Sequence, residues 1–330
     1  MTEAHRKRTS NSSLQWMRSI IQNNTSIFLI YGLIILLSAV SAIFVEDFRK
    51  PVNLFNVLRQ SVPLGLLAIG QTAVLLTGGM DISQEMVARI VGLVVATSFA
   101  ASGGNPALIL PLVLAGIAIG VLLGTINGLL ITQTHGVSFI ITFGMSFILR
   151  GLNLAIARTP IRGVPQVYTE LYYATIGNFP INLFLMALIW FLVWVFFTRT
   201  RLGRNIYAVG GSEHIARLAT IRVNWTLIVT YIISSGFSAL AGLFLLSRMG
   251  IGDPSAAEGM TFQAIVACAV GGISLYGGKG SIIGTLGGTL LITLLSNIFN
   301  LFQINVYYQQ LLLGVIVLIA VAAYKTERSA

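Results

Sequence analysis

A succession of apolar runs, each close to the length of a membrane span, constrains this sequence most. Eight runs lie at 27–45, 57–76, 107–131, 137–157, 181–197, 225–246, 282–300 and 306–323, and two less regular ones end near 101 and cover 262–270. A helix needs about 20 apolar residues to cross a bilayer. A chain that is 55% hydrophobic and 9% charged also has too few charges for a soluble domain. We therefore predict an all-α, polytopic membrane protein with about ten transmembrane helices, organised as a single transmembrane domain over residues 1–330.

The positions of lysine and arginine predict how these spans are oriented. With the polar segment 1–24 placed in the cytoplasm, 12 of the 20 Lys and Arg residues fall inside, six fall outside, and Arg89 and Arg150 lie within the membrane. Cytoplasmic loops of membrane proteins carry an excess of such residues. We expect both termini and the loop 199–223 to be cytoplasmic, and the segment 158–180 to be external.

Several kinds of chemistry lack the residues they need. Gly278-Lys279-Gly280 resembles part of a phosphate-binding loop, but no Ser or Thr follows Lys279. The single Cys268 and the three scattered histidines have no metal-ligand spacing. The net charge of +10 comes from the ends of apolar runs and not from one basic face. We predict no catalytic residue, no bound metal or cofactor and no nucleic-acid partner, so the chain is not expected to be an enzyme.

The acidic residues bear on the energy source of a membrane transporter. An ion-coupled carrier would place paired acids or histidines at mid-membrane. The acids in this chain are predicted near span ends or in loops: Glu46, Asp47, Asp81, Glu85, Glu170, Glu213, Asp253 and Glu258. This placement favours an external energy source over an ion-coupled secondary sugar carrier, which remains the alternative. Glu85 and Arg89 have the spacing of a helical ion pair. We interpret them as paired charges near the inner interface, with a gate or subunit contact as the alternative.

One polar stretch interrupts the apolar runs at 200–223 and reads TRLGRNIYAVGGSEHIARLATIRV. Ser212 follows a Gly-Gly pair as a plausible helix N-cap, and Glu213 suits the first turn of a helix. A short helix outside the hydrocarbon is therefore predicted. Two interpretations fit it: a basic connector that fixes topology, or a docking helix that transmits force from a soluble partner.

Three separated motifs resemble the permease subunits of ribose-type ABC importers. The loop resembles that family's run LGR-x-IYAxGGN-xx-AA-RLSGI-x-V. Residues 77–83, TGGMDIS, resemble its TGGIDLSVGS signature, and residues 271–280, GGISLYGGKG, resemble its VGG-x-SL-x-GGKG run. The sequence departs from the family at 84–86, at Ser212 in place of Asn, and at Thr220 in place of Gly. Because Thr does not adopt a left-handed cap as readily as Gly, we expect the docking helix to end differently here.

The resemblance implies a transmembrane permease subunit of an ATP-driven importer for a sugar or sugar-like solute in the cell inner membrane. Its implied partners are a cytoplasmic ABC ATPase that binds the ATP, a periplasmic solute-binding protein, and a second permease in a homodimer or related heterodimer, all within membrane lipid. The residues expected to shape or form the ATPase contact are Gly203, Arg204, Gly210, Gly211, Ser212, Glu213, Ala216 and Arg217.

Two further sets of residues are predicted from their position within spans. Polar groups inside a membrane either line a path or form hydrogen bonds between helices, and the candidates for a translocation path are Gln71, Asn127, Asn153 and Asn297. Glycines at steps of four share one helix face and let a second helix approach closely. Gly116, Gly120, Gly124 and Gly128 are expected to serve such packing. A second ladder at 280, 284 and 288 suggests an internal duplication of about five spans per half.

Overall fold

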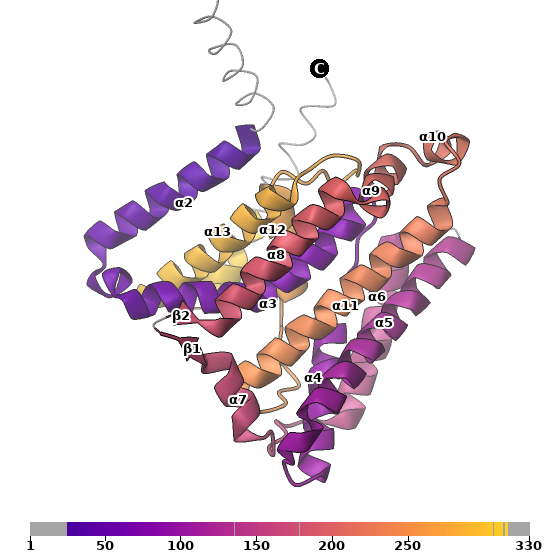
Figure 1. Cartoon of the computed structure of the whole chain (residues 1–330). Coiled ribbons are helices and arrows are strands. Elements are labelled where there is room, and N and C mark those ends of the chain that lie inside the picture. The colour runs from indigo at the N-terminus through magenta and orange to yellow at the C-terminus, as the bar shows by residue number, and fades with distance from the viewer. Residues whose placement is uncertain (1–24, 135, 178, 306, 313, 316–330) are drawn as a thin grey trace, which may run out of the picture.

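The computed structural model describes residues 25–315 except 135, 178, 306 and 313 (Figure 1). The predicted tail 1–24 and most of the predicted run 306–323 lie outside the described residues. The long helices are α2 (Thr25–Phe44), α3 (Pro51–Leu76), α4 (Gln84–Ala101), α5 (Ile109–Thr134), α6 (Ser138–Ile156), α8 (Ile181–Arg199), α11 (Val223–Met249) and α13 (Ile282–Leu301). The shorter ones are α7 (Gln166–Tyr173), α9 (Arg201–Gly211), α10 (Glu213–Leu218), α12 (Met260–Val270), η1 (Glu46–Arg49) and η2 (Pro106–Leu108).

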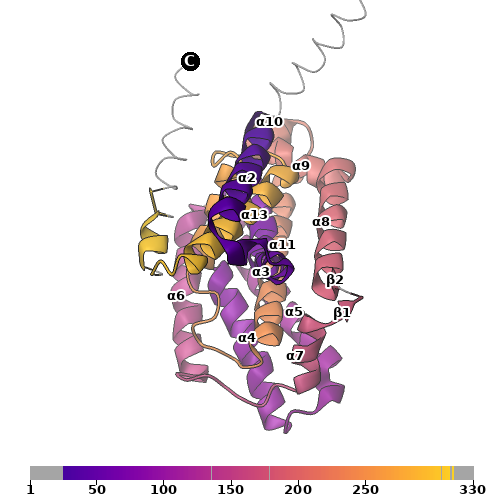
Figure 2. The same ribbon diagram turned by 90° about the vertical axis from the view of Figure 1, so that its left-hand side faces the viewer.

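The prediction of an all-α, polytopic membrane protein is confirmed. Within the described residues, eight helices are long and apolar enough to cross a membrane. The predicted run at 262–270 corresponds to α12, which has only 11 residues and so extends over about 16 Å, roughly half of a bilayer core. The strands β1 (Thr175–Ile176) and β2 (Phe179–Pro180) pair in a small antiparallel hairpin within the predicted external segment. Helices α9 and α10 lie at one end of the bundle and α7 lies at the other (Figures 1 and 2).

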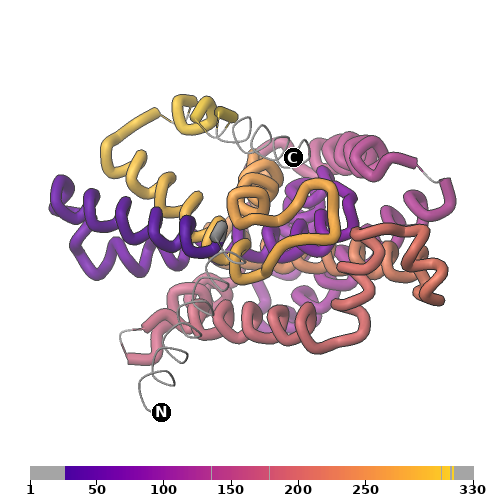
Figure 3. The backbone as a smooth tube through the Cα atoms, turned by 90° about the horizontal axis from the view of Figure 1, so that it is seen from above, coloured from indigo at the N-terminus to yellow at the C-terminus, as the bar shows by residue number. Residues whose placement is uncertain are grey.

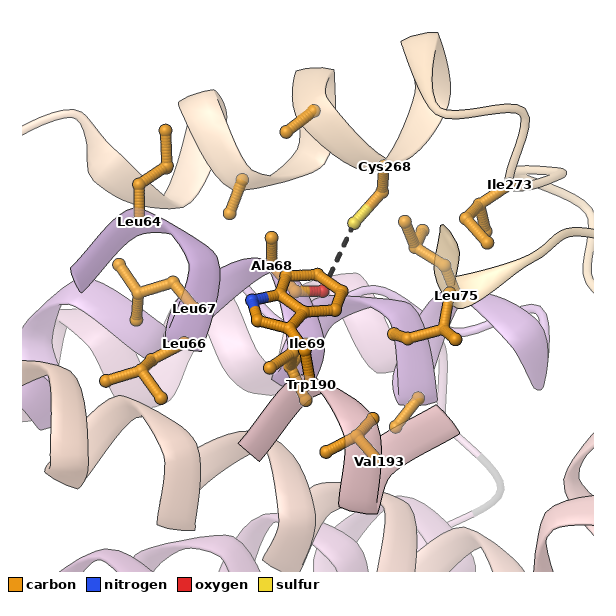
Figure 4. Packing of buried hydrophobic residues seen from close by; sticks show 14 of the residues in the cluster. Leu64, Leu66, Leu67, Ala68, Ile69, Leu75, Trp190, Val193, Cys268 and Ile273 are labelled. Carbon is orange, nitrogen blue, oxygen red and sulfur yellow. Dashed lines mark hydrogen bonds between the residues drawn. The ribbon is translucent and has the colours of Figure 1, made fainter. Parts of the chain in front are cut away.

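Helix α3 is the centre of the core. Every residue from Ser61 to Leu76 is buried, because α11, α12, α13 and α8 all pack around it. Figure 4 shows the apolar side chains of α3 between Trp190 of α8 on one side and Cys268 of α12 on the other. The Cys268 thiol donates to the carbonyl oxygen of Ala68 at 3.3 Å, so the only cysteine of the chain serves packing between these two helices.

Two groups of three helices make equivalent contacts. Helix α3 packs on α12 and α13, as α11 packs on α4 and α5. A Gly-x-x-Asp-x-Ser stretch follows α3 at 78–83, and another follows α11 at 250–255. In the first, Asp81 Oδ1 accepts hydrogen bonds from the backbone N–H and hydroxyl of Ser83. In the second, Asp253 Oδ1 accepts the same pair from Ser255. Because the two stretches follow helices that run in opposite directions, this arrangement is typical of an inverted repeat.

The glycine ladder of α5 lies at its contact with α11. A Cβ on Gly120 would meet the backbone of Ser235 at 2.7 Å, and one on Gly128 would meet the Cα of Ile228 at 2.7 Å. A Cβ on Gly124 would collide with the carbonyl oxygen of Tyr231. A Cβ on Gly116 would meet the side chains of Val91 at 2.9 Å and Leu243 at 3.3 Å. All four glycines are buried, and their lack of a side chain sets the close approach of the two helices.

We expect Gly124→Ala to destabilise the bundle by about 1–3 kcal/mol, the usual effect of inserting a methyl group into a filled interface. Gly144→Ala on α6 is the matched control, since nothing lies within 4 Å of a Cβ built there. The measurement is the thermal unfolding midpoint of the purified chain in detergent. Equal midpoints for the two variants would contradict the tight α5–α11 contact.

Candidate coupling site

Helices α9 and α10 form a short helical hairpin between α8 and α11. Thr200 begins α9, its Oγ1 accepting a hydrogen bond from the backbone N–H of Gly203 at 3.0 Å. Ser212 begins α10 in an extended conformation, and its Oγ accepts from the N–H of Ile215 at 3.3 Å. Both caps satisfy backbone donors that a helix start leaves free. The predicted N-cap at Ser212 and the short helix after it are therefore present in the structure.

Ala216 is the one buried residue of α10, and the other residues of this helix are exposed. Ala216 is 2% exposed and packs with Val209 and Val223. Ile215 and Leu218 are 66% and 72% exposed. Two large apolar side chains are thus exposed on one short helix of a polar loop, and together they form an apolar patch on the outward face of α10. Since Ala216 faces the interior, an arginine there would disturb the packing of the hairpin itself.

Two charged side chains of α10 lie beside this apolar patch in sequence, and Arg204 lies on the neighbouring helix α9. Glu213 and Arg217 are half-exposed and approach to 3.6 Å across one helical turn, and Arg217 also donates to the side chain of Asn224 at 3.2 Å. Arg204 is exposed and donates to the carbonyl oxygen of Arg199 at 3.3 Å. An apolar centre with a polar rim is the usual composition of a protein interface.

The end of α10 differs from the expectation for Thr220. This residue adopts a left-handed conformation with φ of 60°, so the helix ends with the cap that a glycine would give. The N–H of Ile221 donates to the carbonyl of Ala216, and the N–H of Thr220 donates to that of Arg217. These two bonds define a Schellman motif. The prediction of a different helix end is wrong because the two hydrogen bonds hold a β-branched residue where it is rarely found.

We expect Thr220→Gly to stabilise α10 by about 0.5–1 kcal/mol, since a left-handed conformation costs a non-glycine residue about 1–2 kcal/mol and glycine loses more entropy on folding. Slower hydrogen exchange of the α10 amides would reveal the gain. Thr198→Gly within the regular helix α8 is the matched control and should destabilise. Faster exchange of the α10 amides in Thr220→Gly would show that the left-handed conformation of Thr220 does not destabilise the helix.

The three separated motifs meet beneath the hairpin. A Cβ on Gly210 would collide with the carbonyl oxygen of Leu76, at the end of α3, and would meet the N–H of Gly278 at 2.6 Å. That N–H donates to the same Leu76 carbonyl at 2.9 Å. A Cβ on Gly277 would meet the backbone of Gly78 at 2.7 Å. The backbones of all three motifs are thus in direct contact, and Figure 3 shows the α12–α13 loop crossing this end of the bundle.

Tyr207 adds a side-chain link to this junction. Its hydroxyl donates to the carbonyl oxygen of Gly280 at 3.1 Å, and burial raises the pKa of this phenol, so it stays protonated. On the other side, Gly203 packs against the backbone of Phe197, the last turn of α8. Helix α9 is therefore clamped between α8, α3 and the α12–α13 loop.

The predicted coupling residues divide into two groups by exposure. The exposed members, which are open to a partner, are Arg204, Gly211, Glu213 and Arg217. The buried or partly buried members, which shape the hairpin, are Gly203, Gly210, Ser212 and Ala216. The sequence analysis missed Ile215 and Leu218, although two large apolar residues three apart in a polar loop are a usable signal.

Among the described residues, no hydrogen bond joins two of the predicted path residues. Asn297 exchanges two hydrogen bonds with Asn53 at 3.2 and 2.9 Å. Asn153 donates to the carbonyl oxygen of Pro254 at 3.0 Å. Gln71 is fully buried, and neither of its amide atoms has a partner among the described residues.

Asn127, the fourth predicted path residue, belongs to a buried polar network around Asp81. It donates to the hydroxyl of Ser83 at 3.0 Å, and that hydroxyl donates to Asp81 Oδ1 at 2.6 Å. Asp81 Oδ2 accepts from the hydroxyl of Ser234 on α11 at 2.7 Å. Gln84 at the start of α4 also donates to Ser234, at 2.9 Å. The network therefore joins the start of α4 to α5 and α11.

The acids are predicted to lie near span ends or in loops, and Asp81 is indeed in the segment between α3 and α4, yet its side chain is 0% exposed. The segment 77–83 turns back into the bundle instead of running over its surface. The energy-source argument drawn from the acids therefore does not stand on its own.

The chain is thus a bundle of long apolar helices with a polar hairpin at one end, which contacts the segments near 76–78 and 277–280 and carries an exposed apolar patch. This architecture is that of a membrane permease subunit. Over residues 53–321 the chain matches the family described as branched-chain amino acid transport system / permease component, and it belongs to that family.

Several relatives of the chain are permeases of sugar import systems. It is 34% identical to the ribose import permease protein of Haemophilus influenzae, over 96% of this chain and 97% of the relative. It is 38% identical to the ribose import permease protein of Bacillus subtilis, over 88% and 89%, and 32% identical to the D-allose transport system permease protein of Escherichia coli, over 97% and 95%. No solved structure matches the chain.

Family membership confirms several predictions. The chain is a transport subunit and not an enzyme, and it is a multi-pass protein of the inner membrane. The family also implies a separate ATPase and a periplasmic binding protein as its partners.

Proposed function

We propose that this chain is the membrane-spanning subunit of an ATP-driven importer for a monosaccharide or similar solute, and that α9 and α10 receive the ATPase. The observation that carries the proposal is the exposed pair Ile215 and Leu218 on a hairpin whose other face is fixed to the bundle. The sugar assignment rests on the ribose and allose import permeases, to which the chain is similar over nearly its whole length.

The contacts of the hairpin support a mechanism for coupling. Gly210 touches the end of α3 and the α12–α13 loop, and Ala216 packs on Val223, the first residue of α11. A displacement of the hairpin would therefore move the ends of α3 and α11 together. Ser234 of α11 holds Asp81, so the same displacement reaches the start of α4. ATP binding would select one of two arrangements of these helices, and release would restore the other.

A second permease completes this proposal. The face of α6 that points away from α4 and α5 is exposed. On it, the side chains of Phe143, Phe147 and Ile148 are between 44% and 60% exposed. Arg150 on the same helix is also exposed, and an arginine within a span faces protein or water. A partner permease with the solute path between the two chains would meet that need. We propose that the pair consists of this chain and a second copy or a related chain.

The test uses the complex purified through a tag on this chain from its native membrane. Mass spectrometry should identify an ATPase and a periplasmic binding protein. In proteoliposomes containing this complex, uptake of radiolabelled ribose, allose or galactose should require ATP and the binding protein, and leucine should not be taken up. Sugar flux in vesicles without ATP would favour the ion-coupled carrier instead, and leucine uptake would overturn the sugar assignment.

A further inference from the structure

An open groove lies between α8 and α13. Its lining residues are aromatic or aliphatic: Trp190, Phe191 and Trp194 of α8 and Ile282, Ile283 and Leu286 of α13. Trp190 and Ile282 are buried, whereas Phe191 and Ile283 are 58% and 42% exposed, so the groove opens on the outer surface of the bundle. Its volume of about 200 Å³ is below the roughly 300–1,000 Å³ of most small-molecule pockets. The groove therefore suits a slender hydrocarbon chain better than a compact ligand.

Basic side chains lie at the hairpin end of this groove. Ile282 begins α13 three residues after Lys279, and Tyr207 of α9 donates to the carbonyl oxygen of Gly280 at 3.1 Å. Arg204 lies about one helical turn before Tyr207 on α9. Arg204 and Lys279 thus belong to the two segments that meet at this end of the groove, and both are exposed.

These two cations lack an acidic partner. The chain has no Asp or Glu at 171–212 or at 259–326. In the part of the chain that the structure describes, the ion pairs belong to other basic residues, at Lys50, Arg89 and Arg217. Guanidinium and ammonium groups form their strongest hydrogen bonds with carboxylates and phosphates, so a phosphate group would complement Arg204 and Lys279 together.

The buried charges are used within the fold. Glu85 and Arg89 form the predicted pair at 3.4 Å, but their side chains are only 16% and 10% exposed, so they are packed inside the bundle and not at an exposed interface. The Glu85 carboxylate accepts hydrogen bonds from the backbone N–H groups of Thr261 and Gly259. This pair therefore joins α4 to the start of α12 and is not available to a ligand.

The length of the groove region matches a lipid of one leaflet. Trp190 and Arg199 are nine residues apart on α8, about 14 Å of helix, which is close to half of the roughly 30 Å hydrocarbon core. The predicted orientation places the Arg199 end in the cytoplasm, and the cytoplasmic leaflet carries anionic lipids. The tail 1–24 contains four Lys and Arg residues and one acid, so its charge does not complement this end of the groove.

We propose that the groove between α8 and α13 binds an acyl chain of an anionic phospholipid, and that Arg204 and Lys279 contact the phosphate of that lipid. This site is separate from the outward face of α10 and from the solute path between two permeases, so it goes beyond the proposed function. Because the phosphate contacts α9 and the α12–α13 loop together, the bound lipid braces the hairpin against that loop.

The experiment measures lipid retention by native mass spectrometry. The full chain, purified in detergent, is exposed to equal amounts of dioleoylphosphatidylglycerol and dioleoylphosphatidylcholine, and we expect it to retain the phosphatidylglycerol preferentially. Arg204→Gln combined with Lys279→Gln should reduce this preference between about fivefold and 25-fold, since each cation near an anionic surface contributes roughly a factor of five. Equal retention of the two lipids by the unmodified chain, or an unchanged preference in this double variant, would overturn the inference.

Arg158→Gln combined with Arg162→Gln is the matched control. These two arginines are also exposed, but they lie just before α7, at the opposite end of the bundle. The control removes the same amount of charge and should keep the preference for phosphatidylglycerol. An equal loss in both double variants would show that net charge alone attracts the lipid, and this result would also contradict a site at Arg204 and Lys279.

A second variant tests the groove without changing charge. Ile283→Trp places a bulkier side chain at the edge of the groove and should reduce retention of phosphatidylglycerol at least fivefold. Leu188→Trp is its control, because Leu188 is 52% exposed on α8 and does not line the groove. Inorganic phosphate should not displace the lipid, since the acyl chain holds it in place. Normal retention by Ile283→Trp, or full displacement by inorganic phosphate, would show that the groove holds no acyl chain.

Discussion

Gly210→Ala is expected to reduce ATP-dependent uptake at least tenfold, and Gly211→Ala is expected to reduce it much less. The methyl group at Gly210 would occupy the position of the Leu76 carbonyl oxygen, while nothing lies within 4 Å of a Cβ at Gly211. Inserting a methyl group at such a contact costs about 1–3 kcal/mol. The hairpin would relieve this cost by lifting away from α3 and from the α12–α13 loop.

The adjacent glycine makes this pair of variants informative. Both residues belong to α9, and alanine is the better helix former at either position, so intrinsic helix stability changes equally in both. Uptake by proteoliposomes and the amount of ATPase that copurifies with the tagged chain are the two measurements. A normal rate for Gly210→Ala, or an equal loss in both variants, would contradict the role of the three-motif junction in transmitting movement.

The spans could be predicted from the sequence because a bilayer imposes one simple requirement, a run of about 20 apolar residues. The predicted run 225–246 corresponds to α11, Val223–Met249, and the run 282–300 to α13, Ile282–Leu301. The half-length α12 could not be predicted with the same ease. Its 11 residues are apolar like a full span, and only the position of the segment 250–259 decides where the helix starts.

The sequence predicted where the candidate site lies along the chain, but not which of its side chains are exposed. The cap at Ser212 depends on neighbouring residues alone, and the sequence analysis found it. The rotation of α10 depends on Val209 and Val223, which lie outside that helix and bury Ala216. The burial of Asp81 likewise depends on Ser234, which is 153 positions away in the chain. Contacts between distant segments decide these features, and no local pattern carries them.

The second large effect is expected at the outer face of α10. Replacing both Ile215 and Leu218 with Asp should weaken binding of the ATPase by about a hundredfold, because well-buried interface anchors contribute about 1–2 kcal/mol or more each. Both side chains are exposed in the isolated chain, so the substitutions remove no internal packing. Thermal unfolding of the purified subunit should therefore remain unchanged.

Leu171→Asp is the matched control for this effect. Leu171 is 55% exposed on α7, at the opposite end of the bundle, and an acid there adds one negative charge, half that of the double variant, without touching the hairpin. The control should retain both the ATPase and uptake, whereas the double variant should lose both while still reaching the membrane. If the double variant kept its ATPase, the exposed face of α10 would not be the docking surface. In that case the clamped helix α9, with Arg204 exposed, would be the next segment to test.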